Sequence, residues 1–270
     1  MKSVLLTNEI IAQRVFNPLY IYLDIVFLVA LCLLLVFKKK YLTLLFGLAG
    51  GILYMIVDYG IFHLLTHSRS IEGGSMFWVL LWMSMSYGIT NFVMIWLGFS
   101  KDKHLLEWIL FIVVWWIAAP MIAASFGKDL APIKIQRTTG AYHGYMALIL
   151  VSGYMAAIGI NLFRKNKEER FPILWLLAMG IFVQFAWEFS LLVGGIRSAE
   201  FVSFEDKIMT LVVNSLLETN LGQVPSFCIY VAITARFTEK LKKREPVKFF
   251  ERIAELNRMK LRNFDNNQLK

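Results

Sequence analysis

The stretch MFWVLLWMSMSYGITNFVMIWLGF, Met76–Phe99, continues for 24 residues without a charged side chain. A helix that crosses the hydrocarbon core of a bilayer needs about 20 mainly apolar residues. Six further apolar stretches surround it, near residues 18–37, 41–65, 105–126, 141–163, 172–195 and 208–236. The sequence therefore predicts an all-α fold, that of a polytopic integral membrane protein with seven transmembrane helices.

The composition excludes a soluble globular protein. Hydrophobic residues make up 58% of the 270 residues and charged residues 17%, whereas a soluble domain has about 25% charged residues. The net charge is +9, and eleven of the 28 Lys and Arg residues lie within 236–270. A basic segment beside a transmembrane helix is typical of contact with a membrane surface. The sequence therefore predicts membrane lipids as partners and does not predict binding to nucleic acid.

The short basic loops predict the orientation. Positive residues collect at 38–40, 101–103 and 164–170, on the same side of the predicted helices as the basic tail. Cytoplasmic loops carry the excess of Lys and Arg. We therefore expect a multi-pass protein of the cell (plasma) membrane, with the segment 1–17 outside and the tail 237–270 in the cytoplasm.

The tail contains an amphipathic helix. Its apolar residues recur on one helical face among many basic ones: Phe249, Phe250, Ile253, Leu256 and Met259. Such a pattern is typical of a helix that lies on the inner leaflet. The sequence thus predicts that the tail contacts anionic inner-leaflet lipids.

An internal repeat organises the transmembrane domain, 18–236. The second and third apolar stretches align with the sixth and seventh at a constant offset of 129 residues, pairing Leu48 with Leu177, Ala49 with Ala178, Gly51 with Gly180, Ser86 with Ser215, Thr90 with Thr219 and Asn91 with Asn220. We expect two parallel three-helix units, about 18–99 and about 141–236, joined by a linker helix, about 105–126. This arrangement is similar in architecture to facilitators built of three plus one plus three helices.

Three carboxylates lie inside the predicted transmembrane helices: Asp58, Glu188 and Glu218. A charged side chain at the centre of a bilayer costs about 2.5–3.5 kcal/mol on insertion scales, so its presence points to function. They are the predicted catalytic residues. No predicted helix carries a basic residue into the interior, so we do not expect a group that holds a phosphate or carboxylate.

Polar and aromatic side chains share helical faces with these acids. Residues four apart on a helix lie on one face, as Gln184 and Glu188 do, and Asn214 and Glu218. An aromatic ring can stabilise a nearby positive charge. The predicted substrate-binding residues are Tyr54, Tyr87, Asn91, Gln184, Trp187, Asn214 and Asn220. The alternative for the amides is that they only join helices by hydrogen bonds.

No cofactor is predicted, and the candidates for a metal site are three histidines. His63 and His67 are four residues apart, a spacing that can present two imidazoles to one metal ion. His143, at the start of the fifth apolar stretch, is the candidate third ligand. The pair lacks the intervening Glu that metallopeptidases use.

The segment QFAWEF, 184–189, resembles the NFAWE segment of the membrane-integral terpene cyclases of meroterpenoid and indole terpenoid pathways. Those enzymes are similar in length and have seven helices. The resemblance implies acid catalysis by one acid on the second helix, here Asp58, and one on the seventh, here Glu218. The family carries its segment on the second helix, whereas here the segment lies on the sixth, which leaves the role of Glu188 open.

Two functions follow from these features. The first is a membrane-embedded enzyme that acts on an isoprenoid or lipid-like substrate by acid catalysis from the intramembrane carboxylates. The second is a proton- or cation-linked transporter whose midplane site uses the same carboxylates to bind an apolar or cationic small molecule. Gly222 and Pro225 would then allow a break in the seventh helix.

Overall fold

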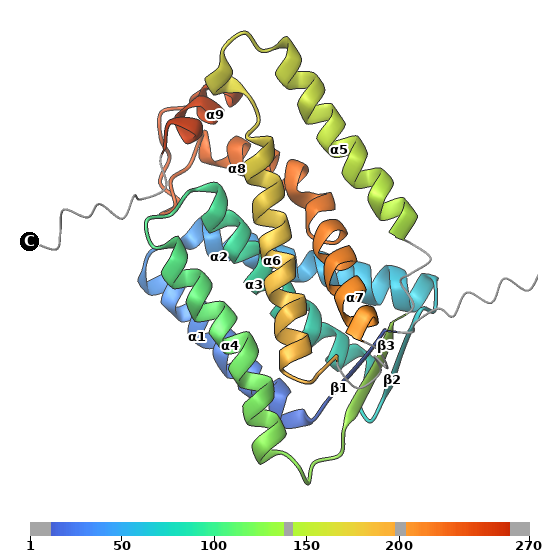
Figure 1. Ribbon diagram of the computed structural model, residues 1–270. Helices are drawn as coiled ribbons and strands as arrows, with labels where there is room; N and C mark the ends of the chain where they lie inside the picture. Colours follow the sequence, from blue (N-terminus) through green and yellow to red (C-terminus); the bar gives the residue numbers. More distant parts are fainter. Residues whose placement is uncertain (1–11, 138–142, 198–203, 260–270) are drawn as a thin grey trace, which may run out of the picture.

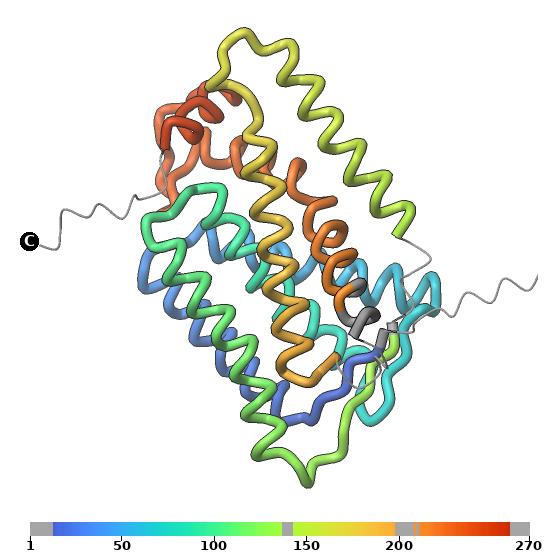
Figure 2. Tube along the Cα trace, viewed as in Figure 1, coloured from blue at the N-terminus to red at the C-terminus, as the bar shows by residue number. Residues whose placement is uncertain are grey.

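The computed structural model describes residues 12–137, 143–197 and 204–259, which form a mostly helical bundle with a small sheet at one end (Figure 1). Figure 2 traces the same path along the chain. The helices are α1 (Pro18–Phe37), α2 (Tyr41–Met55), its π-helical continuation η1 (Ile56–Leu65), α3 (Met76–Phe99), α4 (Leu105–Phe126), α5 (His143–Phe163), the short η3 (Lys167–Glu169), α6 (Ile173–Val193), α7 (Phe204–Leu217), the short η4 (Asn220–Gly222), α8 (Gln223–Thr234) and α9 (Phe249–Arg258). The strands are β1 (Ala12–Phe16), β2 (Arg69–Glu72) and β3 (Ile133–Arg137).

Six helical segments of the described chain are long and apolar enough to cross a membrane: Pro18–Phe37, Tyr41–Leu65, Met76–Phe99, Leu105–Phe126, His143–Phe163 and Lys167–Val193. Apolar side chains also cover the outside of the bundle, as Leu33 on α1 and Leu162 on α5 show. An apolar exterior suits lipid as the surrounding solvent. The described chain is thus mostly helical, with six segments that could cross a membrane by length and composition, which agrees with the predicted class of protein.

The predicted seventh helix, 208–236, is not continuous. α7 ends at Leu217 and α8 begins at Gln223, with η4 between them. Pro225 lacks a backbone N–H, but a proline is tolerated in the first turn of a helix, where no intrahelical acceptor is needed. Seven helices of spanning length are therefore not found in the described residues, and the internal repeat stays a prediction.

Helix α3 is the centre of the bundle. It contacts α1, α2, α4, α6 and α8, and most of its side chains from Met83 to Phe99 are buried. Helix α5 lies at one edge of the bundle (Figure 1) and contacts α6, α7, α8 and η4. Only Tyr154 and Ala157 of α5 are buried.

The strands form an antiparallel sheet in the order β1–β3–β2. We call this side of the bundle the sheet end. Ile133 and Ile135 of β3 are buried, and the Val15 N–H donates to the carbonyl oxygen of Ile196 at 2.9 Å, which joins the sheet to the turn after α6. The sheet corrects the prediction of an all-α fold. Its strands are short and pair with distant parts of the chain, so no local sequence pattern marks them.

The tail covers the opposite side of the bundle, which we call the tail end (Figure 1). Helix α9 contacts α8 and η3, and Lys101 Nζ donates to the carbonyl oxygens of Leu256 at 3.0 Å and Met259 at 2.7 Å. Ile253 and Leu256 are buried. The prediction that the apolar face of α9 contacts lipid is therefore wrong for Ile253 and Leu256, which pack against protein. Contact of the basic side chains with anionic lipids stays a prediction, and residues 1–11 and 260–270 lie outside the described chain.

The close packing of α2 against α3 can be tested at Gly88. A Cβ added there would lie 2.4 Å from the Cα of Gly51. We expect Gly88→Ala to lower the free energy of unfolding by about 1–3 kcal/mol, because the two helices must move apart. Gly60→Ala is the matched control, since an added Cβ there meets no atom within 4 Å. Thermal unfolding in detergent measures both, and equal losses would contradict this packing.

The docking of α9 predicts a pH dependence. Arg244 Nη2 donates to both carboxylate oxygens of Glu255 at 3.1 Å, and Arg252 Nη1 donates to one at 2.6 Å. Burial raises the pKa of Glu255, but these hydrogen bonds and the charges of the two arginines outweigh it and hold the pKa below its ordinary value.

A lowered carboxyl pKa stabilises the folded form above the unfolded pKa, and the stabilisation is lost as the pH falls through the folded pKa. We expect α9 amides to lose protection from hydrogen exchange below about pH 4, corrected for intrinsic rates. Glu255→Gln should remove this loss. An identical pH profile in both proteins would show that the carboxylate does not hold α9 in place.

Candidate functional site

The amide of Gln184 brings two of the predicted acids together. Gln184 and Glu188 are four residues apart on α6, and both are fully buried. Gln184 Nε2 donates to Glu218 Oε2 at 2.7 Å and to Glu188 Oε1 at 3.3 Å. One primary amide therefore links a carboxylate on α6 to a carboxylate just beyond the end of α7.

The oxygen of the same amide lies within hydrogen-bond distance of two hydroxyl groups. Thr219 Oγ1 donates to Gln184 Oε1 at 2.5 Å, and the Tyr87 hydroxyl lies 2.8 Å from it. A glutamine amide has two donor and two acceptor positions, and each of the four has a partner within hydrogen-bond distance here. The amide orientation is therefore fixed, because its NH₂ faces two acceptors and its oxygen faces two donors.

Glu188 is neutralised by an arginine. Arg197, in the turn after α6, forms an ion pair with Glu188 Oε2, and both side chains are buried. Asn214 Nδ2 on α7 donates to Glu188 Oε1 at 3.4 Å. Gly195 has a φ of 77°, a left-handed conformation that glycine adopts without strain, and it turns the chain so that Arg197 returns to the bundle.

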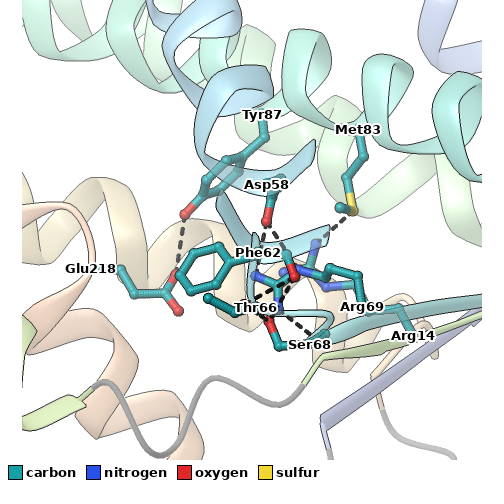
Figure 3. Close-up of polar contacts among 9 residues, drawn as sticks. All are labelled: Arg14, Asp58, Phe62, Thr66, Ser68, Arg69, Met83, Tyr87 and Glu218. Atoms are coloured by element: carbon teal, nitrogen blue, oxygen red, sulfur yellow. Dashed lines mark hydrogen bonds and ion pairs between the residues drawn. The ribbon is translucent and has the colours of Figure 1, made fainter. Parts of the chain in front are cut away.

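Asp58 is neutralised in the same way from the sheet. It lies in the π-helix η1, and Arg69 of β2 donates to its Oδ1 from Nη2 at 2.9 Å and from Nε at 3.2 Å. The guanidinium carbon of Arg69 lies 4.3 Å from the centre of the Phe62 ring. Figure 3 shows this group beside Tyr87 and Glu218. Asp58 is thus held in a buried, charge-balanced pair.

Glu218 has a different environment. Its Oε2 accepts from Gln184 and lies 3.3 Å from the Tyr87 hydroxyl (Figure 3), and both partners are neutral. It forms no ion pair with a residue of the described chain, whereas Asp58 and Glu188 each pair with an arginine. Glu218 is also half-buried, not fully enclosed. Of the three predicted acids, it is the one best placed to contact another molecule.

Aromatic rings line the same region. The ring centres of Tyr54 and Tyr87 are 4.6 Å apart, and those of Tyr87 and Trp187 are 4.8 Å apart. Tyr54 lies close to Glu218 and to Asn91. The Asn91 amide is fully buried, and neither its nitrogen nor its oxygen has a well-aligned hydrogen-bond partner in the described chain. The structure thus gathers five of the predicted substrate-binding residues near Glu218: Tyr54, Tyr87, Asn91, Gln184 and Trp187.

Asn214 and Asn220 have other contacts. Asn214 contacts Glu188, as described above. Asn220 Nδ2 donates to the carbonyl oxygens of Ser215 at 3.4 Å and Leu216 at 3.2 Å, and Tyr154 donates to its Oδ1 at 3.3 Å. These bonds cap the end of α7 and attach α5 to the break. Asn220 therefore holds the broken helix, and its polar atoms are already used.

The histidines do not form a metal site in the described residues, where no three His, Cys, Asp or Glu side chains gather. The helical spacing of His63 and His67 does not persist, because η1 ends at Leu65 and His67 has a φ of 50°. The ring of His63 instead packs against Tyr59, with 5.3 Å between their centres. His143 begins α5.

Sequence analysis missed five buried charged residues, four of them described here and the fifth, Arg252, at the tail end on α9. Arg14, Arg69 and Arg197 are each 4% exposed and enter the bundle from strands or turns at the sheet end. The expectation of an interior without basic groups is therefore wrong. Asp24 on α1 is 1% exposed, and Trp82 Nε1 donates to its Oδ2 at 2.9 Å. Asp24 lies inside the first apolar stretch, so its burial could have been predicted from the sequence in the same way as that of Asp58.

No protein-family model, no curated protein and no solved structure matches this chain. The resemblance of QFAWEF to the terpene cyclases therefore stays a prediction. In the structure this segment lies on α6 and brings Gln184, Trp187 and Glu188 to the site.

The different environments of the acids predict different effects on stability. Asp58→Asn leaves the buried charge of Arg69 without its partner, and breaking such a pair costs about 3–5 kcal/mol. Glu218→Gln leaves no described charge unpaired, so we expect a change below about 1 kcal/mol. Chemical unfolding in detergent measures both. Equal losses would contradict this assignment, and Asp58→Asn with Arg69→Gln should recover part of the loss.

Proposed function

We propose that this protein is a membrane-embedded enzyme that acts on an isoprenoid or other lipid-like substrate by acid catalysis, with Glu218 as the acid. The observation that supports the proposal is the contact set of Glu218: two neutral hydrogen-bond partners, no ion pair with a described residue, and a half-buried side chain. A general acid must release and recover a proton. A carboxylate fixed by an arginine is less suited to this, because the guanidinium favours its ionised form.

The chemistry needs few groups. Glu218 would give its proton to a carbon–carbon double bond or an ether-type oxygen of the substrate. The electron pair of that bond or oxygen forms the new bond to hydrogen, which leaves a positive charge on the substrate. The reaction would end when the substrate returns a proton to Glu218, so that protons balance over the cycle.

The surrounding residues would stabilise both charges. The rings of Tyr54, Tyr87 and Trp187 offer π faces to a carbocation. The Glu218 carboxylate that forms is held by the Gln184 amide and can accept from the Tyr87 hydroxyl. Tyr87 has one hydroxyl proton, so it can donate to Gln184 or to Glu218 but not to both at once.

Asp58 and Glu188 then support the site and do not protonate the substrate. Glu188 and its partner Arg197 fix one side of the Gln184 amide. Asp58 holds Arg69 and with it the Phe62 ring at the sheet end of the site. An apolar substrate could approach such a site from the bilayer, since the protein surface around it is apolar.

Transport is the second candidate, and the broken helix favours it. The break between α7 and α8 begins at Glu218, and transporters place substrate and ion sites at such discontinuous helices. In this case Glu218 would bind a proton or a cationic group of the solute.

We also propose that the tail end faces the cytoplasm of the cell membrane. The basic loops gather there around α9: Lys101 contacts Leu256 and Met259, and Arg258 pairs with Glu168. The positive-inside rule places this side in the cytoplasm, and the sheet end would then face outward.

Untargeted mass spectrometry of lipid extracts and medium tests the function. Cells with the wild-type protein should contain a lipid-phase product that is lost by a factor of about 100 or more in Glu218→Gln cells, the loss expected for a missing general acid. Glu107→Gln is the matched control, because Glu107 lies exposed on α4. If Glu218→Gln cells form the product as wild-type cells do, the proposal that Glu218 is the catalytic acid is refuted. If the set of molecules is unchanged but their distribution between cells and medium differs, the protein is a transporter.

A further inference from the structure

A small hairpin joins α8 to α9 at the tail end. Phe237 and Lys243 form an antiparallel bridge, and the Thr238 N–H donates to the carbonyl oxygen of Lys242 at 2.9 Å. The turn of the hairpin contains Leu241, which has a φ of 59°. We call residues 237–243 the tail hairpin.

Glu239 fixes the tail hairpin to the start of α2. Its carbonyl oxygen accepts from the N–H groups of Tyr41 at 3.0 Å and Leu42 at 3.2 Å. Its Oε2 accepts from the Thr43 N–H at 3.2 Å and the Thr43 hydroxyl at 2.9 Å, and its Oε1 accepts from the buried Trp96 indole of α3. The N–H groups in the first turn of a helix have no intrahelical acceptor. Glu239 supplies the acceptors and thereby holds the hairpin beside the loop between α1 and α2.

This contact brings together exposed lysines from two distant parts of the chain. They are Lys38 and Lys39 in the loop between α1 and α2, and Lys240, Lys242 and Lys243 in the tail hairpin. None of the five forms an ion pair with a residue of the described chain, whereas Lys40 pairs with Asp102. The carboxylate of Glu239 is engaged with α2 and α3. The result is a positive surface whose charge the neighbouring described residues do not neutralise.

These lysines lie at the expected level of the lipid headgroups. Helix α1 ends at Phe37 and α2 begins at Tyr41, and both belong to segments that are long and apolar enough to cross a membrane. A three-residue loop between two such segments lies at the surface of the hydrocarbon layer. Phe37 is 78% exposed and Leu241 is 46% exposed. Apolar side chains therefore accompany the lysines in both segments, an arrangement typical of the membrane interface.

We propose that the loop between α1 and α2 and the tail hairpin together form a binding site for the headgroup of an anionic phospholipid. The lysines bind the phosphate group, and Phe37 and Leu241 contact the acyl chains. The site differs from the lipid contact predicted for α9, because Ile253 and Leu256 of that helix pack against protein.

The bound lipid also supports the bundle. It holds the tail hairpin, and through Glu239 it holds the start of α2 and the Trp96 indole of α3 in place. The proposal rests on the membrane location of the bundle and not on acid catalysis by Glu218. Its test measures lipid binding in detergent solution, so its outcome is independent of the activity and of the orientation in the cell.

Native mass spectrometry of the full chain tests the site. Phosphatidylglycerol and phosphatidylcholine with the same acyl chains are added in equal amounts, and the lipid retained by the protein is measured. Each lysine near an anionic lipid surface strengthens binding by about fivefold. We expect the wild-type protein to prefer phosphatidylglycerol at least tenfold. The triple variant Lys39→Gln, Lys240→Gln, Lys242→Gln should prefer it less than threefold.

A second triple variant is the matched control: Lys103→Gln, Lys165→Gln, Lys167→Gln. These lysines are also exposed at the tail end, and their removal changes the net charge by the same amount. The control should keep the wild-type preference. Equal losses in the two variants would show that the preference follows net charge alone and would overturn the proposal, as would a wild-type protein without a preference.

Leu241→Gly tests the contact with the acyl chains. Glycine adopts a φ of 59° without strain, so this variant should fold, and we expect it to retain at least threefold less phosphatidylglycerol. Leu130→Gly is the matched control, since Leu130 is 45% exposed but lies at the sheet end. Equal retention in both variants, or displacement of the lipid by the same concentration of glycerol 3-phosphate, would overturn the assignment to a lipid.

Discussion

Neutralisation of buried charge is the constraint on which this bundle depends. A carboxylate in an apolar interior is costly unless a positive group or several hydrogen bonds accompany it. Arg69 and Arg197 meet this need for Asp58 and Glu188. Both arginines arrive from the sheet end, so the small sheet and the turn after α6 are part of the interior's charge balance. They are not a peripheral addition.

The same constraint separates the roles of the acids. Glu218 lies where α7 ends, and its described partners are the Tyr87 hydroxyl and the Gln184 amide. Because Gln184 also binds Glu188, the ion pair with Arg197 holds the amide that Glu218 contacts. Glu188 is thus fixed by an ion pair, whereas Glu218 has only neutral partners among the described residues, although both share one amide.

The sequence predicted six of the long helices and two of the three fully buried acids, Asp58 and Glu188, together with the half-buried Glu218, since a charge inside an apolar stretch is a local signal. Asp24 carried the same signal in residues 18–37 and was overlooked. The arginines could not be predicted, because their burial depends on strands that pair across long separations, such as Arg69 opposite Arg137. The break in the seventh helix follows a readable pattern in Gly222 and Pro225, but the hydrogen bonds of Asn220 that stabilise it are tertiary.

Labelling with an apolar carbodiimide tests the central claim most directly, because this reagent enters the bilayer and reacts with protonated carboxyl groups. After reaction in native membranes, peptide mass spectrometry identifies the modified residues. The account predicts modification of Glu218, with Asp58 and Glu188 protected by their arginines. Modification of Asp58 or Glu188 with Glu218 unmodified would contradict it.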